Sequence, residues 1–134
     1  MLRMPEPDQS VLSRRVEIAV ALRKIVPLEA VIDSATQLRP YESDGLTAYR
    51  QMPMLVVLPE TTAQVAAILK YAHANNIKIV PRGAGTSLSG GALPLEDGIL
   101  LGLAKFSRVL DIDFANRCVV VQPGVTNLAI TKAV

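Results

Sequence analysis

The feature that most constrains this chain is a glycine-rich stretch at residues 81–91, which reads Pro-Arg-Gly-Ala-Gly-Thr-Ser-Leu-Ser-Gly-Gly. Four of its eleven residues are glycine and three carry hydroxyl groups. It follows the short apolar run Ile77–Val80, which predicts a strand. Glycine is kept where the backbone takes positive φ or approaches another group closely, and successive N–H groups in a turn form a concave anion site. The stretch therefore predicts a phosphate-binding loop, and our working hypothesis is the pyrophosphate of a dinucleotide.

The residues before the loop predict a strand–helix–strand unit. Leu55–Leu58 is a continuous apolar run that ends at a proline, as expected of a buried strand. Thr61 and Gln64 have the spacing of a capping box, which predicts a helix that extends to about Ala74. Together with Ile77–Val80 these elements form a βαβ unit with a parallel pair of strands and a right-handed crossover. The glycine loop then leaves the carboxyl end of a strand, where open α/β sheets bind ligands.

The first fifty residues predict a helical leader that packs against the rest of the domain. Ser10 is a candidate N-cap for a helix over residues 11–26, which a proline ends. A weaker helix or an irregular stretch covers residues 29–38. We therefore divide the chain into a helical leader, residues 1–50, and a domain proper, residues 51–134. The first helix is predicted to bury Leu12, Val16, Ala19 and Val20 and to expose Arg14, Arg15, Arg23 and Lys24.

Three further strands and a helix are predicted after the loop. Gly98–Leu103 predicts a third strand, and Val109–Asp113 and Arg117–Gln122 alternate in polarity as a β-hairpin does. Thr126 or Asn127 caps a final helix. With the βαβ unit and the first helix, these elements make the fold class α+β. Because the sequence stops inside a helix that has just begun, we expect the chain to be an incomplete part of a longer protein.

Composition excludes several classes of protein. The 134 residues suffice for one modest domain, and the net charge of +2, with 4% aromatic residues and no dense Lys/Arg cluster, argues against nucleic acid as a partner. One cysteine forms neither an internal disulfide nor a cysteine-based zinc site, which favours a reducing compartment. No apolar run approaches the roughly 20 residues of a membrane span, and the first residues lack a signal-peptide pattern. We therefore expect a cytoplasmic protein without a membrane span.

The spacing of the glycines excludes two common nucleotide-binding loops. Leu88 stands where the G-x-G-x-x-G fingerprint of NAD-binding folds requires its third glycine, and the Gly-Lys-Ser/Thr of a P-loop is also missing. A purely structural turn is the alternative interpretation. The hydroxyls of Thr86, Ser87 and Ser89 favour an anion, because a structural turn needs no such group of donors. Arg82 either adds positive charge to the site or braces the loop.

Together with the motifs around it, the loop resembles that of a known family. Residues 81–91 resemble the pyrophosphate loop of the PCMH-type FAD-binding family, also called the vanillyl-alcohol-oxidase family. Within this family the chain from Tyr41 onward is most similar to the glycolate oxidase FAD-linked subunits and to the D-lactate and 2-hydroxyglutarate dehydrogenases. The supporting motifs are Tyr41-Glu42-Ser43-Asp44-Gly45, Leu55-Val56-Val57-Leu58-Pro59, Gly90-Gly91-Ala92-Leu93-Pro94-Leu95 and Gln122-Pro123-Gly124-Val125.

The resemblance implies the FAD-binding part of an oxidoreductase that oxidises a 2-hydroxy acid, of the glycolate or D-lactate type, to the 2-oxo acid. It also implies other oxidase subunits or an electron acceptor as partners. In such enzymes the flavin carries the redox chemistry and the protein orients it. Since family members are several times longer, we expect residues 1–134 alone to bind FAD weakly or not at all and to be inactive. The alternative is a stand-alone nucleotide- or phosphate-binding module without redox activity.

The resemblance also assigns cofactor-binding residues by position. The loop amides and the Ser87 hydroxyl would face the pyrophosphate, framed by Pro81 and Arg82, while the glycine pair at the end of the loop would let the backbone pass close to the cofactor. Thr86 stands where some relatives attach the flavin covalently through a histidine, so FAD is expected to be non-covalent. The catalytic and metal-binding residues of the family would lie beyond Val134, so none is assigned. The expected cofactor-binding set is Pro81, Arg82, Gly83, Ala84, Gly85, Thr86, Ser87, Gly90, Gly91, Pro123, Gly124 and Val125.

Other residues with reactive or polar side chains are interpreted structurally. His73, the one histidine, is predicted to be a surface or packing residue of its helix. Cys118 lies in an apolar strand and is predicted to fill the core. Asp111 and Asp113 alternate on a strand, which indicates solvated charges rather than a metal site. Packing is also the interpretation for Tyr41, Asp44 and Tyr49.

Overall fold

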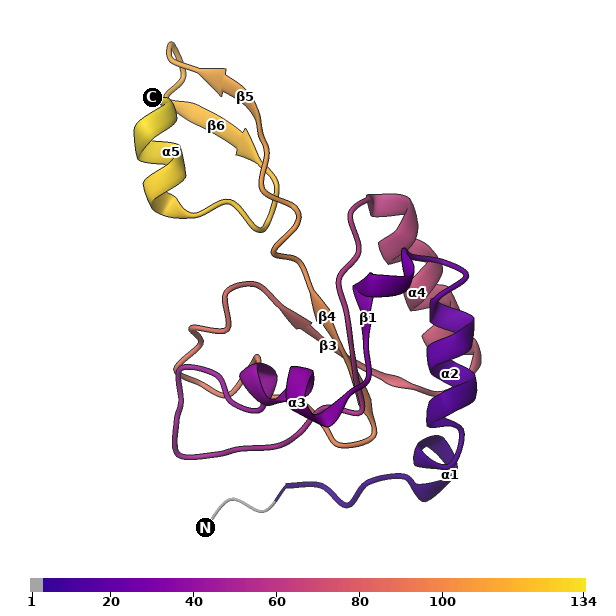
Figure 1. Ribbon diagram of the computed structural model, residues 1–134. Helices are drawn as coiled ribbons and strands as arrows, with labels where there is room; N and C mark the ends of the chain where they lie inside the picture. The colour runs from indigo at the N-terminus through magenta and orange to yellow at the C-terminus, as the bar shows by residue number, and fades with distance from the viewer. Residues whose placement is uncertain (1–3) are drawn as a thin grey trace.

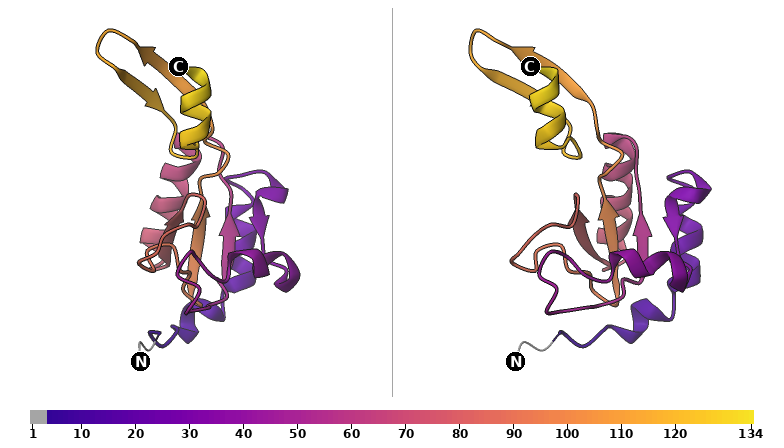
Figure 2. Two further views of the ribbon diagram at one scale, coloured as in Figure 1. Left: turned by 90° about the vertical axis from the view of Figure 1, so that its left-hand side faces the viewer. Right: turned by 60° about the vertical axis from the view of Figure 1, so that its left-hand side comes forward.

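The computed structural model describes residues 4–134 as a four-stranded sheet with helices against it and a smaller unit that projects from one end (Figure 1). The smaller unit, formed by the last two strands and the last helix, extends away from the sheet in two further views as well (Figure 2). The helices are α1 (Gln9–Leu12), α2 (Arg15–Leu22), α3 (Ala35–Leu38), α4 (Thr62–Ala74) and α5 (Asn127–Ala133), with 3₁₀ turns η1 (Leu28–Ala30) and η2 (Arg39–Tyr41). The strands are β1 (Val31–Ile32), β2 (Leu55–Val57), β3 (Lys78–Arg82), β4 (Gly98–Gly102), β5 (Val109–Asp113) and β6 (Cys118–Val121).

The order of strands in the main sheet is β1-β2-β4-β3, with β2, β4 and β3 parallel and β1 antiparallel to β2. The prediction that β2 and β3 pair directly is wrong, because β4 lies between them. All five residues of β4 are buried, as suits a central strand. In β3, Lys78 and Pro81 are exposed, and proline lacks the N–H that a central strand donates. These residues make β3 an edge strand, and the glycine loop leaves from its carboxyl end.

Helix α4 begins where the sequence predicts. The Thr61 hydroxyl accepts a hydrogen bond from the Gln64 amide at 3.2 Å, and the Gln64 side chain accepts one from the Thr61 amide at 3.3 Å. This reciprocal pair is the predicted capping box. Past the end of the helix, Asn76 takes φ 54°, a left-handed conformation that asparagine tolerates. His73 is exposed on this helix, as predicted.

The N-terminal helix differs from the prediction in its cap, its continuity and its buried face. The Asp8 side chain, rather than Ser10, caps α1, and α1 and α2 are separate helices instead of one helix over residues 11–26. Val16 is 77% exposed, whereas Ile18 and Leu22 are fully buried. Apolar residues surround α2 on several sides, so its own pattern does not determine which face is buried. Packing against the sheet selects the face with the larger Ile and Leu side chains.

The arginines of this region hold the helix to the domain instead of extending into solvent as predicted. Arg14 donates to the Asn75 carbonyl at 3.1 Å, beside the end of α4. Arg15 donates to the Met54 carbonyl at 3.1 Å, just before β2. Arg23 forms an ion pair with Asp33 at 2.7 Å. The hydrogen-bonding ends of these long side chains therefore fasten α1 and α2 to the end of α4 and to residues next to β1 and β2.

Alternate residues of the central strands face two hydrophobic clusters on opposite sides of the sheet. Leu55 and Ile99 pack on the side covered by α2 and α4, whereas Val56 and Leu100 pack on the side of α3 (Figure 1). Residues 1–50 thus contribute strand β1 and part of the core to the same sheet as later residues. The division of the chain at residue 50 stays a prediction. Residues 29–38 contain η1, β1 and α3, which agrees with the irregular alternative rather than with one helix.

The buried carboxylate of Asp97 links the start of the chain to the edge of the sheet. It is 2% exposed and accepts hydrogen bonds from Lys78 Nζ at 2.6 Å and from the Asp8 amide at 2.8 Å. Burial alone would raise the pKa of Asp97, but the hydrogen bonds from Lys78 and Asp8 outweigh it and lower the pKa below its ordinary value. A carboxyl with a lowered pKa in the folded state stabilises the fold above its unfolded pKa, and this contribution is lost as pH falls through the folded pKa.

We expect Asp97→Asn to lower the free energy of unfolding at neutral pH by about 1–3 kcal/mol, because Lys78 loses a buried charged partner. The wild-type unfolding temperature should fall as pH drops below 3.8, while that of the variant should fall less steeply. Thermal unfolding between pH 7 and pH 2.5 measures both effects. Asp33→Asn, at a more exposed ion pair, is the control, and parallel pH curves for Asp97→Asn and the wild type would refute the account.

The predicted hairpin is present as β5 and β6, but the prediction that Cys118 fills the core is wrong. The thiol is exposed and donates to the Asn116 carbonyl at 3.3 Å. A two-stranded sheet that projects from the domain leaves much of both faces open, so alternation along β6 does not mean burial. Asp113 accepts hydrogen bonds from the amide and the side chain of Asn116 at 3.0 and 2.6 Å, which closes the turn of the hairpin.

Candidate functional site

The loop that follows β3 presents a run of unpaired backbone donors. None of the N–H groups of residues 83–88 donates a hydrogen bond to any residue among 4–134. Unpaired amides are rare in folded chains unless they face solvent or a ligand. Gly85 and Gly90 take φ 73° and 76°, the left-handed conformations that turn the loop. Consecutive free amides in a turn are the kind of donors that bind an anion.

Arg82 braces this loop from beneath. Its Nη1 donates to the Ser43 carbonyl at 2.8 Å, and the Tyr41 and Ala92 carbonyls lie at 3.5 and 3.4 Å. The guanidinium also lies 5.8 Å from the centre of the Tyr41 ring. A Cβ atom on Gly85 would displace the guanidinium, and the φ of 73° is a conformation that favours glycine. From the sequence, Arg82 either adds positive charge to the site or braces the loop. These contacts support the bracing role, because Nη1 donates to backbone carbonyl groups of the protein.

Two groups of predicted residues that are forty positions apart in the sequence line one cavity. The segment 123–125 leaves β6 and is held by a hydrogen bond of 2.7 Å from the Gly124 amide to the Phe106 carbonyl. It faces the start of the glycine loop across a cavity of about 350 Å³. The cavity is lined by Gly83, Ala84, Ala104, Pro123, Gly124, Val125 and Thr126.

The structure does not bring the other predicted residues into the lining of this cavity, and these include the centre of the loop: Pro81, Arg82, Gly85, Thr86, Ser87, Gly90 and Gly91. Pro81 and Arg82 belong to β3, beneath the loop, and Gly90 and Gly91 lie at its far end. Ala104 and Thr126 line the cavity but were not predicted to bind the cofactor. The Thr126 hydroxyl caps α5 by accepting from the Ala129 amide at 3.2 Å, which is the structural role that the sequence indicates.

The lining of the cavity is uncharged and includes two of the residues with free loop amides, Gly83 and Ala84. None of the seven lining residues has a charged side chain. A Cβ atom on Gly83 would meet no heavy atom within 4 Å, so this glycine leaves open space on its exposed side. Free N–H groups bind an anion without the desolvation of a buried lysine or arginine. The loop and the cavity next to it therefore fit a diphosphate with an attached organic group.

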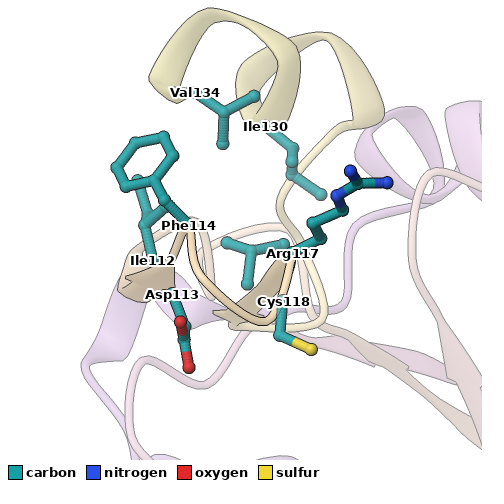
Figure 3. Close-up of a pocket in the computed structure, with 8 residues that line it drawn as sticks. Ile112, Asp113, Phe114, Arg117, Cys118, Ile130 and Val134 are labelled. Atoms are coloured by element: carbon teal, nitrogen blue, oxygen red, sulfur yellow. The ribbon is translucent and has the colours of Figure 1, made fainter.

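A second pocket, of about 330 Å³, lies between the hairpin and α5 (Figure 3). Phe114, Ile130 and Val134 surround its opening, while the Asp113 carboxylate and the Cys118 thiol point away from it (Figure 3). Its lining is mainly aliphatic and aromatic. Arg117 is the cationic residue of this lining. No group of three or more potential metal ligands occurs within residues 4–134.

Comparison with known protein families assigns the segment that contains the glycine loop to a family. The model of a family described as FAD binding domain matches residues 53–134, which is most of the chain. The chain belongs to this FAD-binding domain family. FAD, the cofactor predicted for the loop, is therefore the cofactor of this domain. The matched segment contains both the glycine loop and residues 123–125.

Individual relatives agree with this assignment. The chain is 52% identical to the glycolate oxidase subunit GlcD of Escherichia coli K12 over 120 residues, which are 90% of this chain and 24% of that protein. It is 44% identical to the D-lactate dehydrogenase of Archaeoglobus fulgidus, over 54% of this chain and 16% of that protein. The chain thus spans about a quarter of the length of the GlcD relative.

The solved structure of p-cresol methylhydroxylase with substrate bound has the same fold. The two superpose with a TM-score of 0.79 and 24% sequence identity, over 97% of this chain and 26% of that one. This similarity confirms the predicted α+β, PCMH-type FAD-binding fold. The predicted resemblance to the glycolate oxidase and D-lactate dehydrogenase group is confirmed by the sequence relatives.

Proposed function

We propose that this FAD-binding domain is part of a flavin-dependent oxidoreductase that oxidises a 2-hydroxy acid, glycolate or D-lactate, to the 2-oxo acid. The observation that carries the proposal is the run of six free amides, residues 83–88, beside an uncharged cavity. The substrate class rests on the 52% identity to a glycolate oxidase subunit. When bound, the flavin would accept a hydride equivalent from the α-carbon of the hydroxy acid.

The residues of this chain would hold and orient FAD rather than act on the substrate. The amides from Gly83 to Ser87, with the Ser87 hydroxyl, would bind the pyrophosphate, and the far glycine pair, Gly90 and Gly91, would let the backbone approach the cofactor. Pro81 and Arg82 would support the loop from β3. Pro123, Gly124 and Val125 would form the facing wall of the cavity. Thr86 carries no nucleophilic nitrogen, so FAD would be held without a covalent bond.

We also propose residues 51–134 as the FAD-binding unit and residues 1–50 as a helical leader. The family match from residue 53 supports this division.

Within residues 4–134 no helix is both long and apolar enough to cross a bilayer. We propose a cytoplasmic protein that assembles with other oxidase subunits or transfers its electrons to a separate acceptor. The glycolate oxidase relative is itself described as a subunit, which supports the first of these partners.

The proposed function is tested with the protein expressed from the complete reading frame that contains this chain. We expect a flavin absorbance spectrum, release of the flavin into solution on acid denaturation, and reduction of a dye acceptor with glycolate or D-lactate. Acetate, which lacks the α-hydroxyl, is the control and should give no reduction. Bound flavin without reduction by any 2-hydroxy acid would contradict the proposed reaction and favour a binding module. A protein without flavin after reconstitution would contradict the proposal as a whole.

A further inference from the structure

The connector between η2 and β2 forms the base on which the glycine loop rests. A Cβ atom on Gly45 would lie 2.8 Å from the Thr86 carbonyl oxygen and 2.9 Å from the Ser87 carbonyl oxygen. Real Cβ atoms do not approach other atoms this closely, so any larger residue at this position must displace the loop backbone. The Ser87 carbonyl also accepts a hydrogen bond from the Leu46 amide, so it faces this connector, whereas the Thr86 carbonyl lies side-on to Gly45, with its carbon 3.0 Å from that Cβ position.

The direction of the Ser87 carbonyl sets the direction of the next amide. The described chain contains no cis peptide bond, and in a trans peptide the C=O and the following N–H point in opposite directions. Since the Ser87 carbonyl faces the connector at Gly45 and Leu46, the N–H group of Leu88 points away from it. This N–H has no partner among residues 4–134. It adds one outward-facing donor to the amides predicted from the sequence.

Asp44 holds the same part of the loop through a shared amide. Its Oδ1 accepts a hydrogen bond of 2.9 Å from the Leu46 amide, which also donates to the Ser87 carbonyl at 3.1 Å. The residue is 5% exposed, and its Oδ2 is buried without a hydrogen-bond partner in the described chain. A buried carboxylate oxygen without a hydrogen-bond partner costs stability and therefore calls for an explanation.

We propose that Asp44 and Gly45 are positioning residues of the cofactor loop. This inference rests on the proposed FAD-binding function. Asp44 fixes the Leu46 N–H so that it holds the Ser87 carbonyl, and Gly45 provides the space into which the Thr86 and Ser87 carbonyls fit. Together they fix the peptide between Ser87 and Leu88, so that the Leu88 amide faces outward, toward the pyrophosphate, before it binds. Neither residue touches the cofactor itself.

The test measures the FAD dissociation constant and the unfolding temperature of the apoprotein, using the complete protein. We expect Gly45→Ala and Asp44→Ala each to weaken FAD binding by about tenfold or more, the effect of losing a strong hydrogen bond. Asp44→Asn should restore the affinity to within about threefold of the wild type, because its side-chain carbonyl still accepts from Leu46. That rescue separates positioning from a general loss of stability.

Gly98→Ala is the matched control, because Gly98 begins β4 and pairs with Lys78, at the end of β3 opposite the glycine loop. Its Cβ would lie 3.2 Å from the Leu95 Cβ, so it should lower the unfolding temperature without changing FAD affinity. Unchanged affinity in Gly45→Ala and Asp44→Ala, or an Asp44→Asn variant as weak as Asp44→Ala, would overturn the inference while the proposed function stands. A wild-type protein that binds no FAD would overturn the proposed function and this inference with it.

Discussion

Replacing Gly83 with valine is expected to weaken FAD binding by about a hundredfold or more while leaving the unfolding temperature of the apoprotein nearly unchanged. A Cβ atom at this position meets no heavy atom within 4 Å, so the protein itself has room for the side chain. Gly83 also lines the cavity shared with residues 123–125. A branched side chain there would separate the cofactor from the loop amides, and several hydrogen bonds would be lost together. Fluorescence titration with FAD and calorimetry of the apoprotein measure the two quantities.

Gly85→Ala is the informative comparison, because the two glycines lie two residues apart in one loop. Gly85 takes φ 73°, and a Cβ atom would overlap the Arg82 guanidinium. This substitution should therefore weaken FAD binding and also lower the unfolding temperature. If Gly83→Val binds FAD like the wild type, the cofactor does not approach the open side of Gly83, and the proposed site is wrong.

Replacing Gly124 with alanine is expected to impair both the fold and the cofactor site. The added Cβ would overlap the Leu103 carbonyl oxygen and would lie 2.8 Å from that of Phe106 and 3.1 Å from that of Ala104. These are backbone atoms of the segment that joins the sheet to the hairpin, so they cannot move aside as a flexible side chain can. We expect a loss of about 1–3 kcal/mol in the free energy of unfolding.

The same substitution should weaken FAD binding by more than about tenfold, because it displaces the wall that faces the glycine loop. Urea unfolding of the apoprotein and FAD titration measure the two effects. Lys132→Ala, on the exposed side of α5, is the control and should change neither. A Gly124→Ala variant with wild-type stability and wild-type affinity would show that this segment is not packed as described.

Local signals in the sequence predict several elements correctly. The capping box at Thr61 and Gln64 places the start of α4, because a cap depends on residues within one turn. The apolar runs place β2, β3 and β4, since buried parallel strands are apolar on both faces. The glycine loop is also recognisable, because its left-handed glycines and hydroxyl residues are adjacent in the sequence.

Other features depend on contacts between distant residues and could not be predicted. To predict that β4 lies between β2 and β3, one must compare how well each of the three strands tolerates burial on both faces. The buried face of α2 is selected by packing against the sheet, since its sequence is apolar on more than one side. Cys118 follows an alternating pattern in a hairpin that has no third strand, so alternation there does not bury its side chain.

The candidate site was predictable to a similar degree. The glycine loop could be identified from its own residues, whereas residues 123–125 were added through the family resemblance alone, and the structure brings both to one cavity. No sequence signal identifies Ala104 as a residue that lines the cavity, since an alanine after a strand is common. The support from Gly45 depends on backbone atoms forty residues away, which no local pattern records.

The central claim is that the loop amides hold the pyrophosphate of FAD, and a crystal structure of the complete protein with FAD bound tests it most directly. The account predicts phosphate oxygens within hydrogen-bond distance, about 2.7–3.2 Å, of several backbone nitrogens between Gly83 and Leu88. It also predicts that residues 123–125 line the opposite side of the cofactor. A pyrophosphate bound elsewhere, with these amides still facing solvent, would contradict the account.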